Sequence, residues 1–137
     1  MLDEQLCDDL IEDSKNLKTE PAYVGEGVME KSIRNCSTQH INKKFDEKVF
    51  KVVGNIINKY SQEFKYFHTG LLTEDTGYEY LIYYGKDKGE YKTHVDHFDL
   101  AKKDLNIYLL LNDDYEEVKF QFFEGNDTFI IPKKKGS

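Results

Sequence analysis

The chain has 137 residues and a formal net charge of −7, which predicts a single domain large enough to enclose an apolar core. Hydrophobic residues make up 39% and aromatic residues 14%, a composition that excludes a disordered chain. Because an acidic surface repels phosphate groups, we expect no nucleic-acid partner. The one clear basic run, at 133–135, is open to two interpretations, a solvated turn or a binding patch.

The cysteine content and the hydropathy pattern indicate where the protein works. Cys7 and Cys36 are too few for a disulfide framework, so we expect a reducing, cytoplasmic location. No apolar run approaches the roughly 18 residues of a membrane span, so no membrane association is expected. The acidic start of the chain also lacks the basic region of a signal peptide.

Two helices are predicted in the first half of the chain. Residues 3–17 place Leu6, Leu10 and Ile11 on one face, with acidic residues in the first turns where they suit the helix dipole. Residues 20–40 contain Pro21 and two glycines, which predict loop with at most a short strand near 22–24. Apolar residues recur at helical spacing over 43–60, which predicts the second helix.

Strands are predicted from about residue 78 onward. The expected strands are 78–84, 91–95, 104–111, 118–123 and one beginning at 128–131, separated by turns at 85–89, 112–114 and 124–127. Over 118–123, Phe120 and Phe122 alternate with Lys119 and Gln121, as in a half-buried strand. Helices followed by short strands predict an α+β domain whose sheet region is a barrel or a sandwich.

The segment with the most chemical content contains His94, Val95 and Asp96. On a strand, His94 and Asp96 would point to the same face, because side chains alternate between faces. An imidazole and a carboxylate are two of the three protein ligands that hold non-haem Fe(II) in many oxygenases. On spacing alone the signal is weak, and an ordinary surface pair is the alternative.

The order of motifs around this pair resembles the prolyl-4-hydroxylase-like family of Fe(II)/2-oxoglutarate-dependent dioxygenases. The matching elements run over nearly the whole chain: Leu6 to Ile11, Arg34 to Ser37, Tyr84, the glycine-containing turn 85–89, Tyr91, His94 to Asp96, Leu111 to Asp113, Tyr115 to Val118, the strand 119–123 and Pro132 to Ser137. Each motif is moderately specific by itself, and the set is more specific in this order.

The resemblance implies a fold and a set of roles. It implies a double-stranded β-helix, a jelly-roll or cupin-like fold, carrying N-terminal helices. Within one domain, 1–137, residues 1–70 would form the helical support and 71–137 an incomplete β-helix core. His94 and Asp96 would bind Fe(II), Tyr84 would hydrogen-bond the cosubstrate 2-oxoglutarate, and Arg34 would lie near the substrate entrance. The substrate would be a peptidyl group or a small molecule, and the family also admits ascorbate as a reductant.

Each assignment has a simpler alternative. Tyr84 and Tyr91 could be core aromatics, and Arg34, the single arginine, could form a structural ion pair. We expect His97 to be a surface residue or a supporting neighbour rather than a ligand, because it faces away from His94 on an ideal strand. Asp99 is typical of a turn.

The sequence departs from the family pattern in two respects. No histidine follows His97, so the third ligand and the basic residue beyond it are missing, and Glu117-Val118 replaces a Gly-Gly pair. Three explanations stay open: a fragment, a short form that takes its third ligand from His40, His68 or another chain, and a catalytically inactive relative that serves as a protein-interaction module. A missing strand would leave a sheet edge unpaired, so we expect a homo-oligomer.

Overall fold

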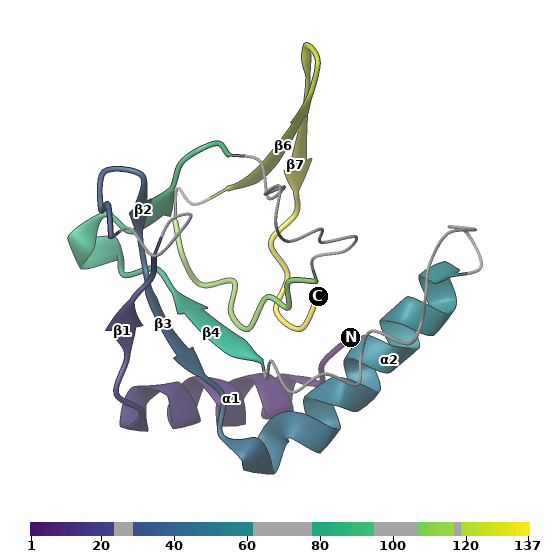
Figure 1. Cartoon of the computed structure of the whole chain (residues 1–137). Helices are drawn as coiled ribbons and strands as arrows, with labels where there is room; N and C mark the ends of the chain where they lie inside the picture. Colours follow the sequence, from purple (N-terminus) through teal and green to yellow (C-terminus); the bar gives the residue numbers. More distant parts are fainter. Residues whose placement is uncertain (24–28, 62–77, 95–106, 117–118) are drawn as a thin grey trace.

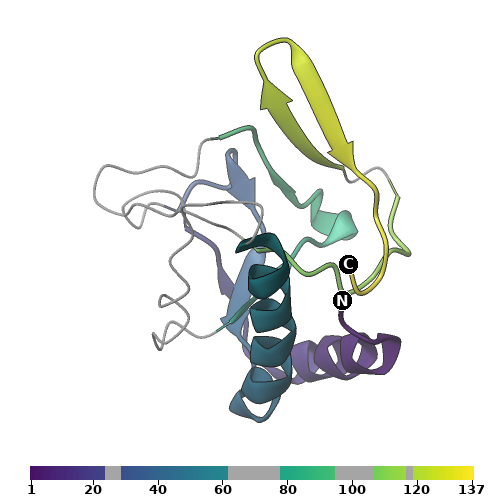
Figure 2. The same ribbon diagram turned by 90° about the vertical axis from the view of Figure 1, so that its right-hand side faces the viewer.

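The computed structural model describes residues 1–23, 29–61, 78–94, 107–116 and 119–137. These residues form an α+β arrangement, as the sequence predicts, with the helices at one end and the hairpin of β6 (Phe120–Glu124) and β7 (Asp127–Ile131) at the other (Figures 1 and 2). His97, Asp99 and His68 lie outside the described residues, as do Asp96 and the first part of the strand predicted at 104–111. None of the described helices is both long and apolar enough to cross a membrane.

Helix α1 (Glu4–Asn16) begins where the sequence predicts. The Asp3 carboxylate accepts a hydrogen bond from the Leu6 amide at 2.7 Å, which satisfies one of the free N–H groups of the first turn. Leu6, Cys7 and Leu10 are buried along one face, at the spacing expected for an amphipathic helix. The helix ends at Asn16, whose side-chain amide donates to the Glu12 carbonyl.

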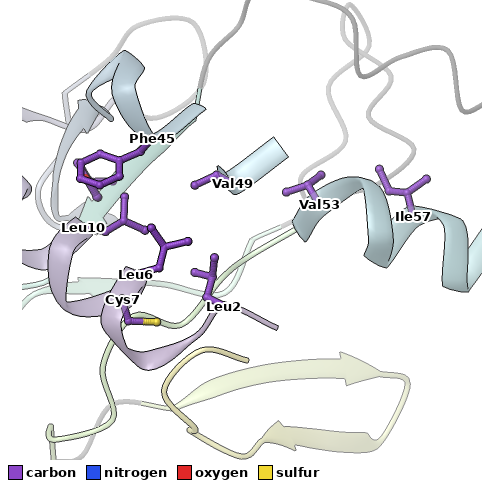
Figure 3. Close-up of a cluster of buried hydrophobic side chains, with 9 residues drawn as sticks. Leu2, Leu6, Cys7, Leu10, Phe45, Val49, Val53 and Ile57 are labelled. Atoms are coloured by element: carbon purple, nitrogen blue, oxygen red, sulfur yellow. The ribbon is translucent and has the colours of Figure 1, made fainter. Parts of the chain in front are cut away.

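Helix α2 (Asp46–Ser61) follows a short 3-10 turn, η1 (Lys43–Phe45), and supplies the other half of the core. Phe45, Val49, Val53 and Ile57 are buried at intervals of four, and they pack toward the buried face of α1 (Figure 3). Leu2 and Tyr80 complete this cluster, which we call the helical core. Both predicted helices are therefore confirmed, and their apolar faces meet each other.

A buried carboxylate lies at the edge of the helical core. Asp13 is 9% exposed; its Oδ2 accepts a hydrogen bond from the Tyr80 hydroxyl at 3.2 Å, and its Oδ1 lies 3.6 Å from Lys44 Nζ. A buried charge is costly unless it is paired and hydrogen-bonded, and here both conditions are met. Burial, and secondarily the negative charge of Asp13, raise the pKa of Tyr80, so its phenol stays protonated.

Three antiparallel strands form a sheet in the order β1–β3–β4, of which β1 and β3 lie between α1 and α2 in the chain and β4 follows α2. They are β1 (Glu20–Pro21), β3 (Ser37–His40) and β4 (Glu79–Ile82). Ser37 pairs with Ile82 and His40 with Glu79. The prediction of loop over 20–40 is wrong for β1, for β2 (Arg34–Asn35) and for β3, because the strand structure of this polar segment comes from pairing with distant residues and not from local alternation.

The end of the chain is tied to its beginning. The Leu2 amide donates to the Gly136 carbonyl at 2.9 Å, and the Gly136 amide donates to the Leu110 carbonyl at 2.7 Å. Gly136 has φ +81°, and a Cβ there would overlap the Leu2 carbonyl oxygen, so only glycine fits. Both termini therefore lie side by side (Figures 1 and 2).

The described part of the predicted strand 104–111, residues 107–111, is not assigned as a strand. Its Leu110 amide donates to the Ser137 carbonyl at 2.8 Å and its Leu110 carbonyl accepts from Gly136, so the C-terminal tail takes the place of a neighbouring strand. Backbone N–H and C=O groups need hydrogen-bond partners, and here the C-terminal tail supplies them in place of the ladder of a neighbouring strand.

The basic run at 133–135 matches neither interpretation, a solvated turn or a binding patch. Lys135 Nζ lies 2.6 Å from Asp8 Oδ1 on α1, and its backbone amide donates to Asp113 Oδ2 at 3.1 Å. Lys133 Nζ donates to the Tyr115 carbonyl and lies 4.8 Å from the centre of the Tyr115 ring. Two of the three lysines thus dock the tail onto the rest of the molecule.

The last two strands, β6 (Phe120–Glu124) and β7 (Asp127–Ile131), form a hairpin around Gly125 and Asn126. Gly125 has φ +59°, the conformation required at the first central position of a type II′ turn. The turn at 124–127 is confirmed. The expectation of a half-buried strand is wrong, because Phe122 and Phe123 on opposite faces are both about half exposed, at 50% and 53%.

The described strands form one three-stranded and two two-stranded sheets and do not close into a barrel or a jelly roll. The coarse α+β class is therefore established. The double-stranded β-helix remains a proposal.

Candidate functional site

The candidate site lies where β2 (Arg34–Asn35) pairs with β5 (Glu90–Tyr91), after the tight turn that leaves β4. The Tyr84 carbonyl accepts hydrogen bonds from the Asp87 and Gly89 amides at 3.1 and 3.0 Å. A Cβ at Gly89 would lie 2.9 Å from Tyr83 Cα, so glycine is required where the chain returns across itself. Lys88 adopts the left-handed backbone conformation, with φ +50°, where the chain reverses its direction.

The β2–β5 register places Arg34 directly across from Tyr91. The Arg34 guanidinium lies 4.7 Å from the centre of the Tyr91 ring, a cation–π contact. The Tyr91 and His94 rings are stacked with their centres 3.5 Å apart and an interplanar angle of 14°. Tyr91 therefore joins two of the residues that the sequence singled out, and we call Arg34, Tyr91 and His94 the ring cluster.

Strand β5 is shorter than predicted, which changes how His94 is presented. The strand ends at Tyr91, and residues 92–94 leave the sheet, with the Lys92 amide still donating to the Ile33 carbonyl at 2.9 Å. His94 is therefore not on a strand, and the argument from strand alternation does not position it. The ladder ends here because its partner β2 has only two residues.

The hydrogen bond of His94 fixes its tautomer. Nδ1 of His94 lies 2.6 Å from the Lys92 carbonyl oxygen. Because a carbonyl can only accept, Nδ1 must carry the proton, and in the neutral ring the lone pair is then on Nε2. Metal-binding histidines commonly show this arrangement, in which one ring N–H is held by a carbonyl or carboxylate and the other nitrogen binds the metal. His94 is also exposed.

Arg34 lies in an environment that is unusual for an arginine, because part of its guanidinium group is buried. Its Nη1 donates to the Tyr23 carbonyl at 2.9 Å, and in the described part of the chain its buried Nε has no acceptor. Burial alone would lower the pKa of Arg34, but the neighbouring Cys36 thiol and the Tyr83 and Tyr91 phenols raise it, so the guanidinium stays charged. The described contacts of Arg34 are with the Tyr23 carbonyl, the Tyr91 ring and the Cys36 thiol, and whether it also forms an ion pair stays a prediction.

The residues around Arg34 form a partly enclosed polar group that the sequence did not reveal. Burial raises the pKa of Tyr83, and the adjacent Cys36 adds to this effect. Cys36 is buried and, like Cys7, is a free thiol. The tetrapeptide Arg34 to Ser37 drew attention to this part of the sequence. Nothing in it indicated that Tyr83 would lie beside the Cys36 thiol, because that contact depends on the β3–β4 register.

The remaining predicted residues fall at different places. Tyr84 is 41% exposed with Lys86 Nζ 5.4 Å from its ring centre, which excludes it from the core. Asp96 lies outside the described residues. His40, a candidate third ligand, is exposed in β3 and lies 3.8 Å from Glu79. Over the described ranges, no group of three or more histidine, cysteine, aspartate or glutamate side chains could hold a metal ion.

His94 offers one imidazole whose lone pair is on Nε2, and the Arg34 Nε–H is a hydrogen-bond donor beside the ring cluster. In comparisons with known proteins, the chain matches no family model, no curated protein and no solved structure.

Proposed function

We propose that the chain derives from the prolyl-4-hydroxylase-like Fe(II)/2-oxoglutarate-dependent dioxygenases, with a double-stranded β-helix as its parent fold. The observation that carries the proposal is the hydrogen bond between His94 Nδ1 and the Lys92 carbonyl, which leaves the lone pair on Nε2. The ordered motifs from Tyr84 to Ser137 are the second support. The proposed class is an oxidoreductase that hydroxylates a peptidyl or small-molecule substrate.

In this proposal His94 and Asp96 hold the metal. When bound, Fe(II) with 2-oxoglutarate supplies the oxidising power to hydroxylate a C–H bond, with succinate and carbon dioxide as the other products. The chain's own task is then to hold His94 in one orientation, and the Lys92 carbonyl and the Tyr91 ring do this from two directions.

Tyr84 and Arg34 would bind the organic molecules. The exposed phenol of Tyr84 can donate a hydrogen bond to a carboxylate, which is the role proposed for it toward 2-oxoglutarate. The charged Arg34, with a buried donor that lacks an acceptor, can receive a carbonyl or carboxylate of the substrate. Its stacking on Tyr91 would orient the guanidinium plane at the substrate entrance.

The alternative function is a protein-interaction module on the same scaffold without catalysis. One observation favours it: the β6–β7 hairpin exposes large apolar residues on both faces. Retained iron binding separates the two functions, because an interaction module has no need of His94 as a ligand.

The test is an anaerobic titration of Fe(II) into the protein with 2-oxoglutarate, following the visible charge-transfer band of the chelated cosubstrate. We expect the band in the wild type, its loss in His94→Ala and Asp96→Ala, and its retention in Phe123→Lys, which changes an exposed residue of the β6–β7 hairpin and serves as the control. A band of equal strength in His94→Ala, or none in the wild type, would contradict the dioxygenase proposal and favour the interaction module.

A further inference from the structure

Residues 132–137, which we call the strap, lie against the start of the chain and against the segment 107–116. The Leu110 backbone pairs with Gly136 and Ser137 at 2.7 and 2.8 Å, and the Leu2 amide donates to the Gly136 carbonyl at 2.9 Å. The Lys135 amide donates to Asp113 Oδ2 at 3.1 Å. The described contacts that hold the strap are therefore polar, and most of them are made by its backbone.

The strap buries no apolar side chain of its own. Residues 132–134 are exposed, Lys135 and Ser137 are half-buried, and the one buried residue of the strap, Gly136, has no side chain. In the helical core, by contrast, Leu6 and Leu10 pack among other buried apolar residues. Segments with few buried apolar contacts open at a lower free energy than the core does, so the strap is the part of this region expected to detach first.

Cys7 of α1 lies beneath the strap. Its side chain is fully buried, and its Sγ points toward the C-terminal segment in Figure 3. A Cβ built on Gly136 would lie 3.7 Å from Cys7 Sγ, so the Gly136 backbone lies next to the sulfur. Because Leu6 and Leu10 hold α1 against α2, detachment of the strap would uncover the Cys7 thiol without unfolding the helix.

One ion pair joins the strap to the helix that carries Cys7. Lys135 Nζ lies 2.6 Å from Asp8 Oδ1, and the two side chains are 24% and 58% exposed. The hydrogen bond to Asp8 raises the pKa of Lys135, so its ammonium group stays charged. Since water screens such a partly exposed pair, it contributes only modestly to docking, and its loss should loosen the strap without unfolding the protein.

The closed strap also affects the ionisation of the thiol. Burial is the main cause that raises the pKa of Cys7, and the positive charge of Lys135 opposes it. The covered thiol is therefore protonated at neutral pH, whereas the thiolate is the form that reacts with electrophiles. Beneath the strap, Cys7 is protected both by the lack of access and by its protonation.

We propose that the strap detaches as a unit while the helical core stays folded, and that its opening and closing control access to the Cys7 thiol. The Lys135–Asp8 ion pair and the close fit of Gly136 hold it closed. The proposal is independent of the proposed catalytic function, because it uses no residue of the ring cluster.

Pulse labelling of the full chain with N-ethylmaleimide tests the proposal, with peptide mass spectrometry to separate Cys7 from Cys36. The rates are measured over a series of low urea concentrations and compared with global unfolding in urea. We expect Cys7 to react faster than global unfolding allows, at a rate that urea hardly changes, because the strap exposes little surface when it opens. A Cys7 rate that follows global unfolding at every urea concentration would overturn the proposal.

Two variants of the strap identify what holds it closed. Lys135→Ala should raise the Cys7 labelling rate about twofold to fivefold, the range expected for a partly exposed ion pair. Gly136→Ala should raise it about tenfold or more, because the added Cβ would overlap the Leu2 carbonyl at a residue with φ +81°. Loss of the Lys135 charge alone would make the thiol less reactive, so a faster rate reports access.

Two controls separate strap opening from general destabilisation. Lys134→Ala removes the same charge from the exposed neighbouring residue and should leave the Cys7 rate unchanged. Cys36, a buried free thiol that follows β2, should keep its wild-type labelling rate in every strap variant. An equal rise in Lys134→Ala, or a Cys36 rate that rises together with that of Cys7, would contradict the proposal.

Discussion

The helical core and the β6–β7 hairpin use similar apolar residues in opposite ways. In the helical core, two amphipathic helices turn their apolar faces toward each other, so that Leu10 and Val53 are almost fully buried. In the hairpin, Phe123 and Phe129 on two different faces remain half exposed. Since apolar burial is the main favourable term in folding, the first region holds the molecule together, whereas the second leaves apolar surface exposed.

The largest expected effect comes from breaking the helical core. Leu10→Ala should lower the free energy of unfolding by about 3 kcal/mol, because Leu10 is 2% exposed and its removal leaves a cavity. Phe123→Ala, at a half-exposed position of the hairpin, should change it by at most about 0.5 kcal/mol. Urea unfolding of the two variants measures the difference. Equal losses would mean that the hairpin contributes to the folded state as the helices do.

A second prediction concerns the tie between the termini. Gly136→Ala should lower the free energy of unfolding by about 2 kcal/mol, because the residue has φ +81° and its Cβ would overlap the Leu2 carbonyl. Gly54→Ala is the matched control, since a Cβ there meets nothing within 4 Å in the middle of α2. It should stabilise the protein by about 0.5–1 kcal/mol. Thermal unfolding compares the two. A stable Gly136→Ala would show that the tail does not dock as described.

A third, smaller effect tests the edge of the helical core. Tyr80→Phe removes the hydrogen bond to Asp13 and should lower the free energy of unfolding by about 1.5 kcal/mol at neutral pH. Burial first, and Asp13 second, raise the pKa of Tyr80 above its value near 10 in the unfolded chain. The folded state therefore holds this proton more tightly, and its contribution is complete below about pH 10 and is lost as the pH rises further.

The measurement is the free energy of unfolding against pH in the wild type and in Tyr80→Phe. The variant should show a shallower alkaline decline, although Tyr78 and Tyr83, whose pKa values burial also raises, remain. An identical alkaline slope in both proteins would mean that Tyr80 does not titrate with folding. Lys44→Ala should have less effect than Tyr80→Phe, because its ammonium is largely exposed.

The sequence predicted those parts of the fold that depend on local spacing. The helices follow from apolar residues such as Leu6 and Leu10 at helical intervals, and the hairpin turn follows from Gly125 between two apolar strands. Strand β3 could not be predicted, because Thr38 and Gln39 become a strand only through pairing with Leu81 and Tyr80, which lie far along the chain.

The candidate site was predictable in chemistry but not in geometry. His94 and Arg34 were singled out as separate motifs, and only the register between β2 and β5 shows that Tyr91 joins them. The expected strand through His94 failed because the ladder ends at Tyr91, and the orientation of the imidazole comes instead from the Lys92 carbonyl. A backbone carbonyl leaves no mark in the sequence, so this contact could not have been foreseen.

An anaerobic Fe(II) titration with 2-oxoglutarate asks whether the exposed imidazole of His94 is a metal ligand. We expect a charge-transfer band that is lost in His94→Ala and kept in Phe123→Lys, which alters the β6–β7 hairpin alone. A band that survives in His94→Ala, or one that never forms in the wild type, would contradict the proposed role of His94.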